Sequence, residues 1–479
     1  MLKETISLHD HYQFEIKLSL PFEDPGSKGI YSVDTYLFIP NSLNIHPGTL
    51  GRKEFFGRLK NYIRLRIPWT RLDALDAPQG PLGRLVALLH NAESGQQPMQ
   101  EEFEDHVKVF CLAAKRALRA RGLKAASSPA DRAPGAALEY LCQSRDLLRE
   151  YRALAPVVRR TGLEHSPAYG YGEEFLSIVT TYYAFRMLDR LQAMPAAQEA
   201  ARQVHAFISA ELACRSRLTG AAIARPDDDN EHFVFRWSML KKYMSSALFL
   251  DVRERRDRRF WQQVVAGVAA GVAMVVATAI AFIWQGRYGS LSTPLFMALI
   301  ISYIFKDRMK DLLKASMSSW LRRILADRKL AIFRNFTTLV GVCKETFGYV
   351  SEKSLPPEIL ALRDKVHMVD VSNAFRKETI IHYHKDIIVK PRAHSLMANG
   401  FCDGMLDITR LGVHDFLRSM DDPEEPLYVL DGDRCRRVRG SKVYHLNMIR
   451  SRIGPEGRKS SRYRIVLDRD GIKRVERIR

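Results

Sequence analysis

The chain of 479 residues lacks the short motifs that mark several common enzyme classes. It has no G-x-S-x-G, no H-E-x-x-H and no dinucleotide-binding G-x-G-x-x-G. The segment 457–460 reads G-R-K-S but lacks the upstream glycine that a phosphate-binding P-loop requires. We therefore predict no catalytic activity, no bound cofactor and no nucleotide site of these kinds.

Paired cysteines and a secretion signal are also missing. The six cysteines are far apart and form no C-x-x-C, so we expect free thiols in a reducing compartment. The first twenty residues have no basic segment followed by an apolar one, and their apolar residues alternate with polar ones. The first half of the chain is therefore expected to stay in the cytoplasm.

Basic residues are present in clear excess. The chain has 74 Lys and Arg against 54 Asp and Glu, a formal net charge of +20, which favours an anionic partner. Half of this excess falls in residues 430–479, with sixteen basic against six acidic side chains. Arginines two positions apart share a strand face, which predicts contact with an anionic surface through Arg434, Arg436, Arg462 and Arg464.

Charge is absent from one long segment in the middle of the chain. Residues 260–286 carry no charged side chain, have a tryptophan near each end, and follow five arginines within residues 253–259. At about 1.5 Å per residue, such a helix is long enough to cross the hydrocarbon core of a bilayer. The arginines place its first end on the cytoplasmic side.

A second uncharged segment follows at residues 288–305. Its strongly apolar part is only twelve residues long, but Lys306, Arg308, Lys310 and Lys314 come directly after it. The positive-inside bias therefore favours a second crossing. The sequence predicts a two-span α-helical transmembrane hairpin over residues 253–306 in the cell (inner) membrane, with both termini cytoplasmic.

The first predicted span contains a G-x-x-x-G at Gly267 and Gly271, continued by alanines at helical spacing. Small residues let two helix backbones approach closely, so these glycines are predicted to mediate transmembrane helix packing. The partner is either the second span of the same chain or another copy of the protein.

Hydrophobic periodicity predicts the regions on either side of the hairpin. Residues 1–70 are expected to form a β-hairpin, with strands at 11–22 and 29–40, and an amphipathic helix at 52–66. Residues 71–252 are expected to form a helical bundle, and the two regions together make a cytoplasmic α+β region. The last bundle helix is expected to continue into the membrane. Residues 307–366 are predicted to be a helical linker, and residues 367–479 a small basic antiparallel β-rich domain, with a tight turn at the D-R-D-G of residues 468–471.

An H-x-H-x-D at His382, His384 and Asp386 has the ligand types and spacing of a metallo-β-lactamase-like metal site. In that family a further histidine closes the motif, whereas here Ile387 follows, and fewer than a hundred residues remain. We therefore predict an ordinary polar strand face and no metal.

These features predict a non-enzymatic integral membrane protein that anchors cytoplasmic binding, assembly or signalling domains at the inner leaflet. The expected partners are the lipid bilayer, anionic lipid headgroups, a cytoplasmic protein and a second copy of the chain. The first alternative is a membrane-anchored effector that binds nucleic acid, or acts on the membrane by oligomerising its hairpin. The second is a membrane-tethered enzyme whose site matches none of the motifs named above. Aromatic residues are sparse among the basic strands, so nucleic acid is the weaker expectation.

Overall fold

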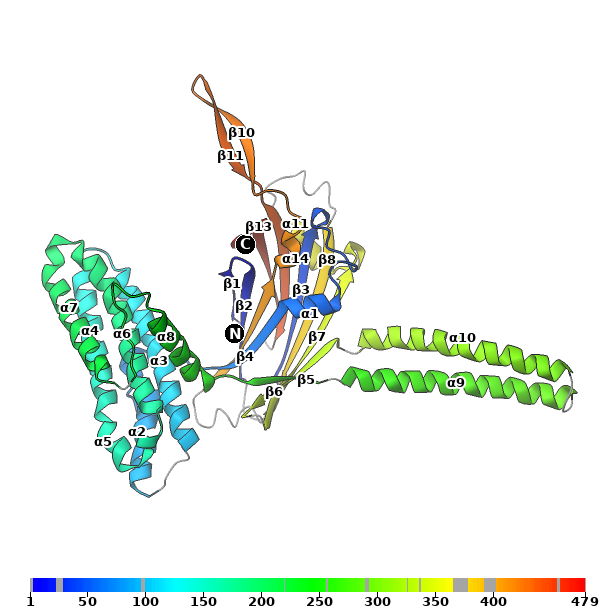
Figure 1. The fold of residues 1–479 in the computed structure, drawn as a ribbon, viewed down its shortest axis with the longest axis horizontal. Helices are drawn as coiled ribbons and strands as arrows, with labels where there is room; N and C mark the ends of the chain where they lie inside the picture. Colours follow the sequence, from blue (N-terminus) through cyan, green and yellow to red (C-terminus); the bar gives the residue numbers. More distant parts are fainter. Residues whose placement is uncertain are drawn as a thin grey trace. The chain divides into compact units, whose positions relative to one another are not determined.

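The fold is described from a computed structural model of the chain (Figure 1). It describes all residues except 1–2, 23–28, 96–99, 219, 256, 289–292, 325, 336, 365–377, 392–401, 455–456 and 479. The chain forms two compact units. The β unit comprises Met1–Ile63, Leu250–Ser395 and Leu406–Arg479, and the helical unit comprises Arg64–Phe249 and Leu396–Met405.

The largest element of the β unit is an eight-stranded antiparallel sheet. Its order is β14 (Gly471–Ile478), β13 (Gly457–Asp468), β12 (Tyr444–Gly454), β3 (Gly29–Pro40), β8 (Glu378–Val389), β7 (Thr338–Val350), β6 (Arg328–Arg334) and β5 (Asp251–Arg255). Strand β3, from the start of the chain, therefore lies between two strands from its last quarter. The predicted separate C-terminal β-rich domain is wrong, because its strands complete a sheet with N-terminal ones.

A second sheet has the order β1 (Lys3–Asp10), β2 (Gln13–Pro21), β9 (Gly404–Gly412) and β4 (Leu59–Arg66). The main hydrophobic core contains side chains from both sheets, from Phe14 and Ile16 in β2 to Met448 in β12 and Ile465 in β13. The predicted hairpin between residues 11–22 and 29–40 is not formed. Strand β2 pairs instead with β1, an earlier strand that the sequence analysis did not propose.

The predicted amphipathic helix after residue 51 is only half correct. Helix α1 covers Arg52–Arg58, and β4 begins at the next residue. Leu59, Ile63 and Leu65 are the buried residues of β4, and the last two follow the two-residue period of a strand. Phe55, Leu59 and Ile63 recur every fourth residue, which fits a helix equally well, so pairing within the sheet decides that residues 59–66 form a strand.

The helical unit consists of α2 (Pro81–Glu93), α3 (Gln100–Ala126), α4 (Ala133–Ala153), α5 (Ala155–Arg160), α6 (Ala168–Gln192), α7 (Gln198–Ser216) and α8 (Glu231–Ser246). Phe103, Phe110 and Phe175 are fully buried between these helices. Helix α8 ends at Ser246 and is followed by β5, so it does not run on into the apolar segment.

The apolar segment forms two long helices between β5 and β6, namely α9 (Asp257–Tyr288) and α10 (Thr293–Ile324). They lie side by side in opposite directions (Figure 1), and the Ser302 hydroxyl donates a hydrogen bond of 3.1 Å to the carbonyl of Ala277. Other short elements of the β unit include α11 (Pro357–Asp364), α14 (His414–Leu417) and a two-stranded ribbon of β10 (Glu424–Asp431) with β11 (Arg434–Ser441). The expected helical linker over 307–366 is wrong beyond α10, because it contains β6, β7 and α11.

The predicted two-span membrane fold is also wrong. Among the described residues, only one helix is long and apolar enough to cross a membrane, at Gln263–Arg287 of α9. Tyr288, which was counted into the second span, ends α9, and α10 begins at Thr293. Thirteen uncharged residues, 293–305, are then left in α10, and they reach only about 20 Å of the roughly 30 Å required. The chain is a mixed α/β protein.

Candidate functional site: an apolar helical hairpin and a polar sheet face

The α9–α10 hairpin exposes an unusual amount of large apolar surface for a folded chain. Its distal part, nearest the turn, exposes large apolar side chains from both helices. Among the described residues they include Met274, Val275, Phe282, Ile283, Trp284, Phe296, Met297, Leu299, Ile300, Ile301, Tyr303, Ile304 and Phe305. A contiguous apolar surface of this kind marks a site of contact with lipid or protein. The hairpin is therefore the first candidate functional surface.

One face of α9 packs against α10, and the predicted glycine motif lies on another. Among the α9 side chains that the structure describes, Val265, Ala269 and Ala273 are buried, and they recur every fourth position. Gly267 and Gly271 are exposed, and a Cβ atom added to either would meet no described atom within 4 Å. The structure therefore does not place these glycines against α10, which was one of the two partners considered.

Charged residues of α10 lie beside the apolar part of α9. Counting along both helices from the contact between Ser302 and Ala277 sets Lys306 level with Ala273, and Lys310 level with Ala269. Lys310 lies 3.6 Å from Asp307, and Lys306 lies over the ring of Tyr303 at 4.2 Å. Two crossings in this register would put these charges inside the hydrocarbon core, which is a further reason why the two-span prediction fails.

The second candidate surface is the outer face of the eight-stranded sheet, which points away from the main core. Alternate residues of β8 are buried: Ile381 and Tyr383 belong to the main core, and Ile387 lies on the same side of the strand. His382, His384 and Asp386 therefore lie on the outer face, followed by Ile388 and Lys390. Helix α11 packs on one end of this face in a smaller cluster with Tyr36, Phe38, Ile380 and Ile449.

A group of four polar side chains, here called the His–Asp cluster, occupies the middle of this face. It contains His382, His384 and Asp386 of β8, and Asp34 of β3, which is the register partner of His384. One carboxylate oxygen of Asp34 lies 2.8 Å from His382 Nε2 and 2.8 Å from His384 Nδ1. The other ring nitrogen of His384 lies 3.2 Å from Asp386. The sequence indicated three of these residues, and Asp34 was missed.

The two histidines set the electrostatics of the cluster. Partial burial would raise the pKa of Asp34, but the hydrogen bonds from His382 and His384 outweigh it and hold that pKa well below its usual range. The hydrogen bond to Asp34 raises the pKa of His384 to about 9, against the opposing effect of burial and with help from Asp386. The side chain of Asp386 is fixed in turn by a hydrogen bond of 2.5 Å from Ser32.

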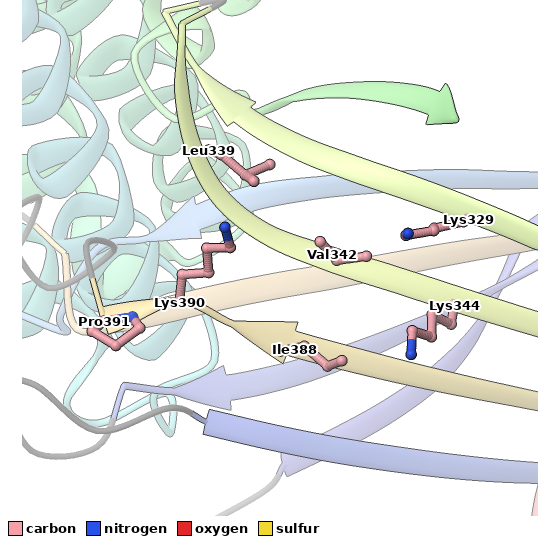
Figure 2. Close-up of a pocket in the computed structure, with 7 residues that line it drawn as sticks. All are labelled: Lys329, Leu339, Val342, Lys344, Ile388, Lys390 and Pro391. Atoms are coloured by element: carbon pink, nitrogen blue, oxygen red, sulfur yellow. The ribbon is translucent and has the colours of Figure 1, made fainter. Parts of the chain in front are cut away.

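An open cavity of about 630 Å³ lies further along the same face, at the ends of β7 and β8. Figure 2 shows the side chains that line it: Lys329, Lys344 and Lys390, with Leu339, Val342, Ile388 and Pro391. Lys344 is the register partner of Asp386, so the cavity and the His–Asp cluster are neighbours on one face. Three ammonium groups beside apolar side chains are suited to bind a ligand that carries an anionic group on an apolar portion.

The four arginines predicted to meet an anionic surface are not brought together. Arg434 and Arg436 are exposed on the β10–β11 ribbon. Arg462 and Arg464 share the outer face of β13 as expected, but they are only 4% and 6% exposed. Arg462 donates to the carbonyl of Leu362 and to the side chain of Asn447, because α11 covers that end of the sheet. The expected solvent-facing arginine pair is therefore not found on β13.

Comparison with protein-family models, curated proteins and solved structures finds no match. The fold and the two surfaces define a mixed α/β protein in which, over the part of the chain that the structure describes, one helix is apolar and long enough to cross a membrane.

Proposed function

We propose that this is a non-enzymatic, membrane-associated binding protein. Its α9–α10 hairpin enters a bilayer from one side, turns within it and leaves on the same side. In this proposal the distal part of the hairpin is embedded in lipid, and both compact units stay outside, on the cytoplasmic side. The observation that carries the proposal is the exposed apolar surface on the distal halves of both helices.

The chain connections support entry and exit on one side. Helix α9 follows β5, and β6 follows α10, and these two strands pair with each other along Asp251–Arg255. A single crossing by α9 alone would place β5 and β6 on opposite sides of the membrane and break their pairing. A hairpin that enters and returns keeps the eight-stranded sheet intact.

The depth of insertion follows from the charges of α10. The uncharged residues 293–305 span about 20 Å, more than one leaflet but less than the whole hydrocarbon core. Arg287 lies in the last turn of α9, at the embedded tip, and its long side chain extends from there towards the opposite headgroups. Lys306, Arg308 and Lys310 then lie near the headgroups, where each basic residue contributes about 1 kcal/mol of attraction to anionic lipid. Anionic lipid headgroups are thus the proposed partners of this end of the embedded segment.

The proposal is tested by measuring the depth in the bilayer of two sites with similar exposure to solvent, Ile300 and Val268. A nitroxide-quenchable fluorophore is attached at Ile300→Cys in the distal part, or at Val268→Cys in the proximal part, in full-length protein lacking Cys142, Cys214 and Cys435. With liposomes that contain anionic lipid, the label at 300 should be quenched by nitroxides in the acyl chains, while the label at 268 should not. Quenching at both positions would mean that both helices cross, and quenching at neither would reject insertion.

A second candidate function is an effector that oligomerises through α9. Gly267 and Gly271 lie on an exposed face with Val264, Val268 and Val275, and no described part of the chain covers it. At the insertion depth proposed above, most of this face of α9 stays outside the lipid, where the same face of a second copy of the protein could pack against it. The homo-oligomer is therefore retained as a proposal with its own test, given below.

A further inference from the structure

We propose that Asp34, His382 and His384 bind a divalent transition-metal ion, and that Zn²⁺ is the ion that suits them best. The potential ligand atoms of these three side chains all lie within 4.8 Å of one another. They come from the adjacent strands β3 and β8, whose register places Asp34 directly opposite His384. This site is independent of the proposed membrane association.

The geometry of the rings favours a shared ligand point. His382 Nε2 and His384 Nδ1 both aim at the same oxygen atom of Asp34, each at 2.8 Å. Two imidazole nitrogens and one carboxylate oxygen that converge in this way form a ligand set that Zn²⁺ uses at sites with an open position. Small side-chain rotations would move the three ligand atoms apart, so that an ion placed between them makes a bond of roughly 2.0–2.2 Å to each.

Neighbouring groups hold these ligands as they do in established metal sites. The second nitrogen of His384 faces Asp386 at 3.2 Å, and Ser32 donates a hydrogen bond to that carboxylate. Histidine ligands commonly use their other ring nitrogen in this way, which fixes the tautomer and the ring orientation. The ring of His382 stacks on Tyr36, with centroids 4.6 Å apart and planes at 10°.

The surroundings leave the site accessible. The side chains of Asp34, His382 and His384 are partly exposed, so an ion can enter without unfolding the sheet. The register partners of His384 and His382 on β7 are Thr346 and Gly348, which add no competing charge. Three protein ligands leave a coordination position for water or for an anionic group, on the face that also carries the lysine-lined cavity.

The test uses Co²⁺ as a spectroscopic substitute for Zn²⁺ in full-length, chelator-treated protein. One Co²⁺ should bind per chain with a visible absorption band typical of nitrogen and oxygen ligands, and added Zn²⁺ should remove that band. Failure to bind Co²⁺ would overturn the proposal. A strong thiolate charge-transfer band would overturn it too, because it would place the ion on cysteines.

Variants then assign the ligands. Asp34→Asn and His384→Gln should each abolish Co²⁺ binding, whereas Asp386→Asn should weaken it by about 10–100-fold, as expected for a group that only orients a ligand. His445→Gln, a histidine of the same sheet outside the cluster, should bind as the wild type does. Zn²⁺ should raise the melting temperature of the wild type but not of Asp34→Asn, whose own melting transition shows that it is folded. Unchanged binding by both ligand variants would reject the assignment.

Discussion

Lys385 is a buried cation on the core side of β8, one position from the His–Asp cluster on the opposite face. Its ammonium group lies 2.7 Å from Asp407 of β9 and 3.3 Å from the hydroxyl of Thr409, so it links the two sheets. Glu345 of β7 lies close by and accepts hydrogen bonds from Tyr383 and Asn61. Burial lowers the pKa of Lys385, but the neighbouring Asp407, Cys343 and Glu345 together outweigh burial and leave that pKa above its ordinary value. The charge is therefore retained in the core.

Replacing Lys385 by Met should lower the free energy of unfolding by about 3–5 kcal/mol, because it leaves Asp407 buried without its partner. Urea denaturation of the full chain measures this change. Lys344→Met is the matched control, since Lys344 is an exposed lysine on the other face of the same sheet, and it should change stability by no more than about 0.5 kcal/mol. Equal effects of the two substitutions would contradict a special role for the buried lysine.

The sequence predicted some of these residues and could not predict others. The pattern H-x-H-x-D was enough to place three polar side chains on one strand face. Asp34, which completes the cluster, is 348 residues away from His382, and no local spacing indicates it. Arg462 was correctly placed on a strand face, but its burial depends on α11, which covers that face from elsewhere in the chain. Burial of a strand face is a tertiary property.

At the level of elements, the exposed face of α9 around Gly267 and Gly271 can be tested directly. If this face joins two copies, Gly267→Ile with Gly271→Ile should abolish crosslinked dimers while liposome binding persists, because the added side chains block close backbone approach. Crosslinking of full-length protein on liposomes measures the dimer. Unchanged crosslinking would show that Gly267 and Gly271 do not mediate contact between two copies of the protein.

A control pair on the same helix separates packing within the hairpin from packing between copies. Ala269 and Ala273 are fully buried against α10, so Ala269→Ile with Ala273→Ile should destabilise the hairpin itself. This variant should lose helix content at a lower temperature than the glycine variant. Similar melting of the two would mean that both faces pack in the same way.

The elements themselves were easier to predict than their partners. The strand runs at β3, β8 and β13 and the Asp-Gly turn before β14 were correctly identified from alternation and turn residues. In that turn Gly471 has φ of +138°, and an added Cβ would lie 2.3 Å from the carbonyl oxygen of His11, so only glycine fits. The pairing of β2 with β1 was missed, because alternation shows that a strand has a buried face but not which strand lies beside it.

At the level of the whole molecule, the single sheet restricts how the chain can be arranged at a membrane. Strand β3 pairs with β8 and β12, and β5 pairs with β6, so segments before and after the hairpin belong to one β unit. Reporters fused at residue 1 and after residue 479 should therefore lie on the same side of a membrane, which is the cytoplasmic side in the function proposed above. Reporter activity in cells that express the fusion proteins checks this. Reporters on opposite sides of the membrane would be incompatible with the sheet.

The failure of the two-span prediction has a physical cause at this scale. Hydropathy and flanking charge describe each helix separately, and by that measure residues 288–305 were acceptable. The register between α9 and α10 sets the charges of one helix beside the apolar part of the other, and this register comes from their packing. The same applies to the C-terminal strands, which looked like a domain of their own until their N-terminal neighbour was known.

The central position of β3 has a consequence for biosynthesis. Its two neighbours, β8 and β12, are made about 340 to 410 residues later, which corresponds to roughly 20–80 s of translation at typical rates. The helical unit and the apolar hairpin leave the ribosome during that interval, while β1, β2 and β3 still have unpaired edges. Capture of the hairpin by a membrane in this period would hold the unfinished chain at that surface, away from other nascent chains, until the last strands arrive.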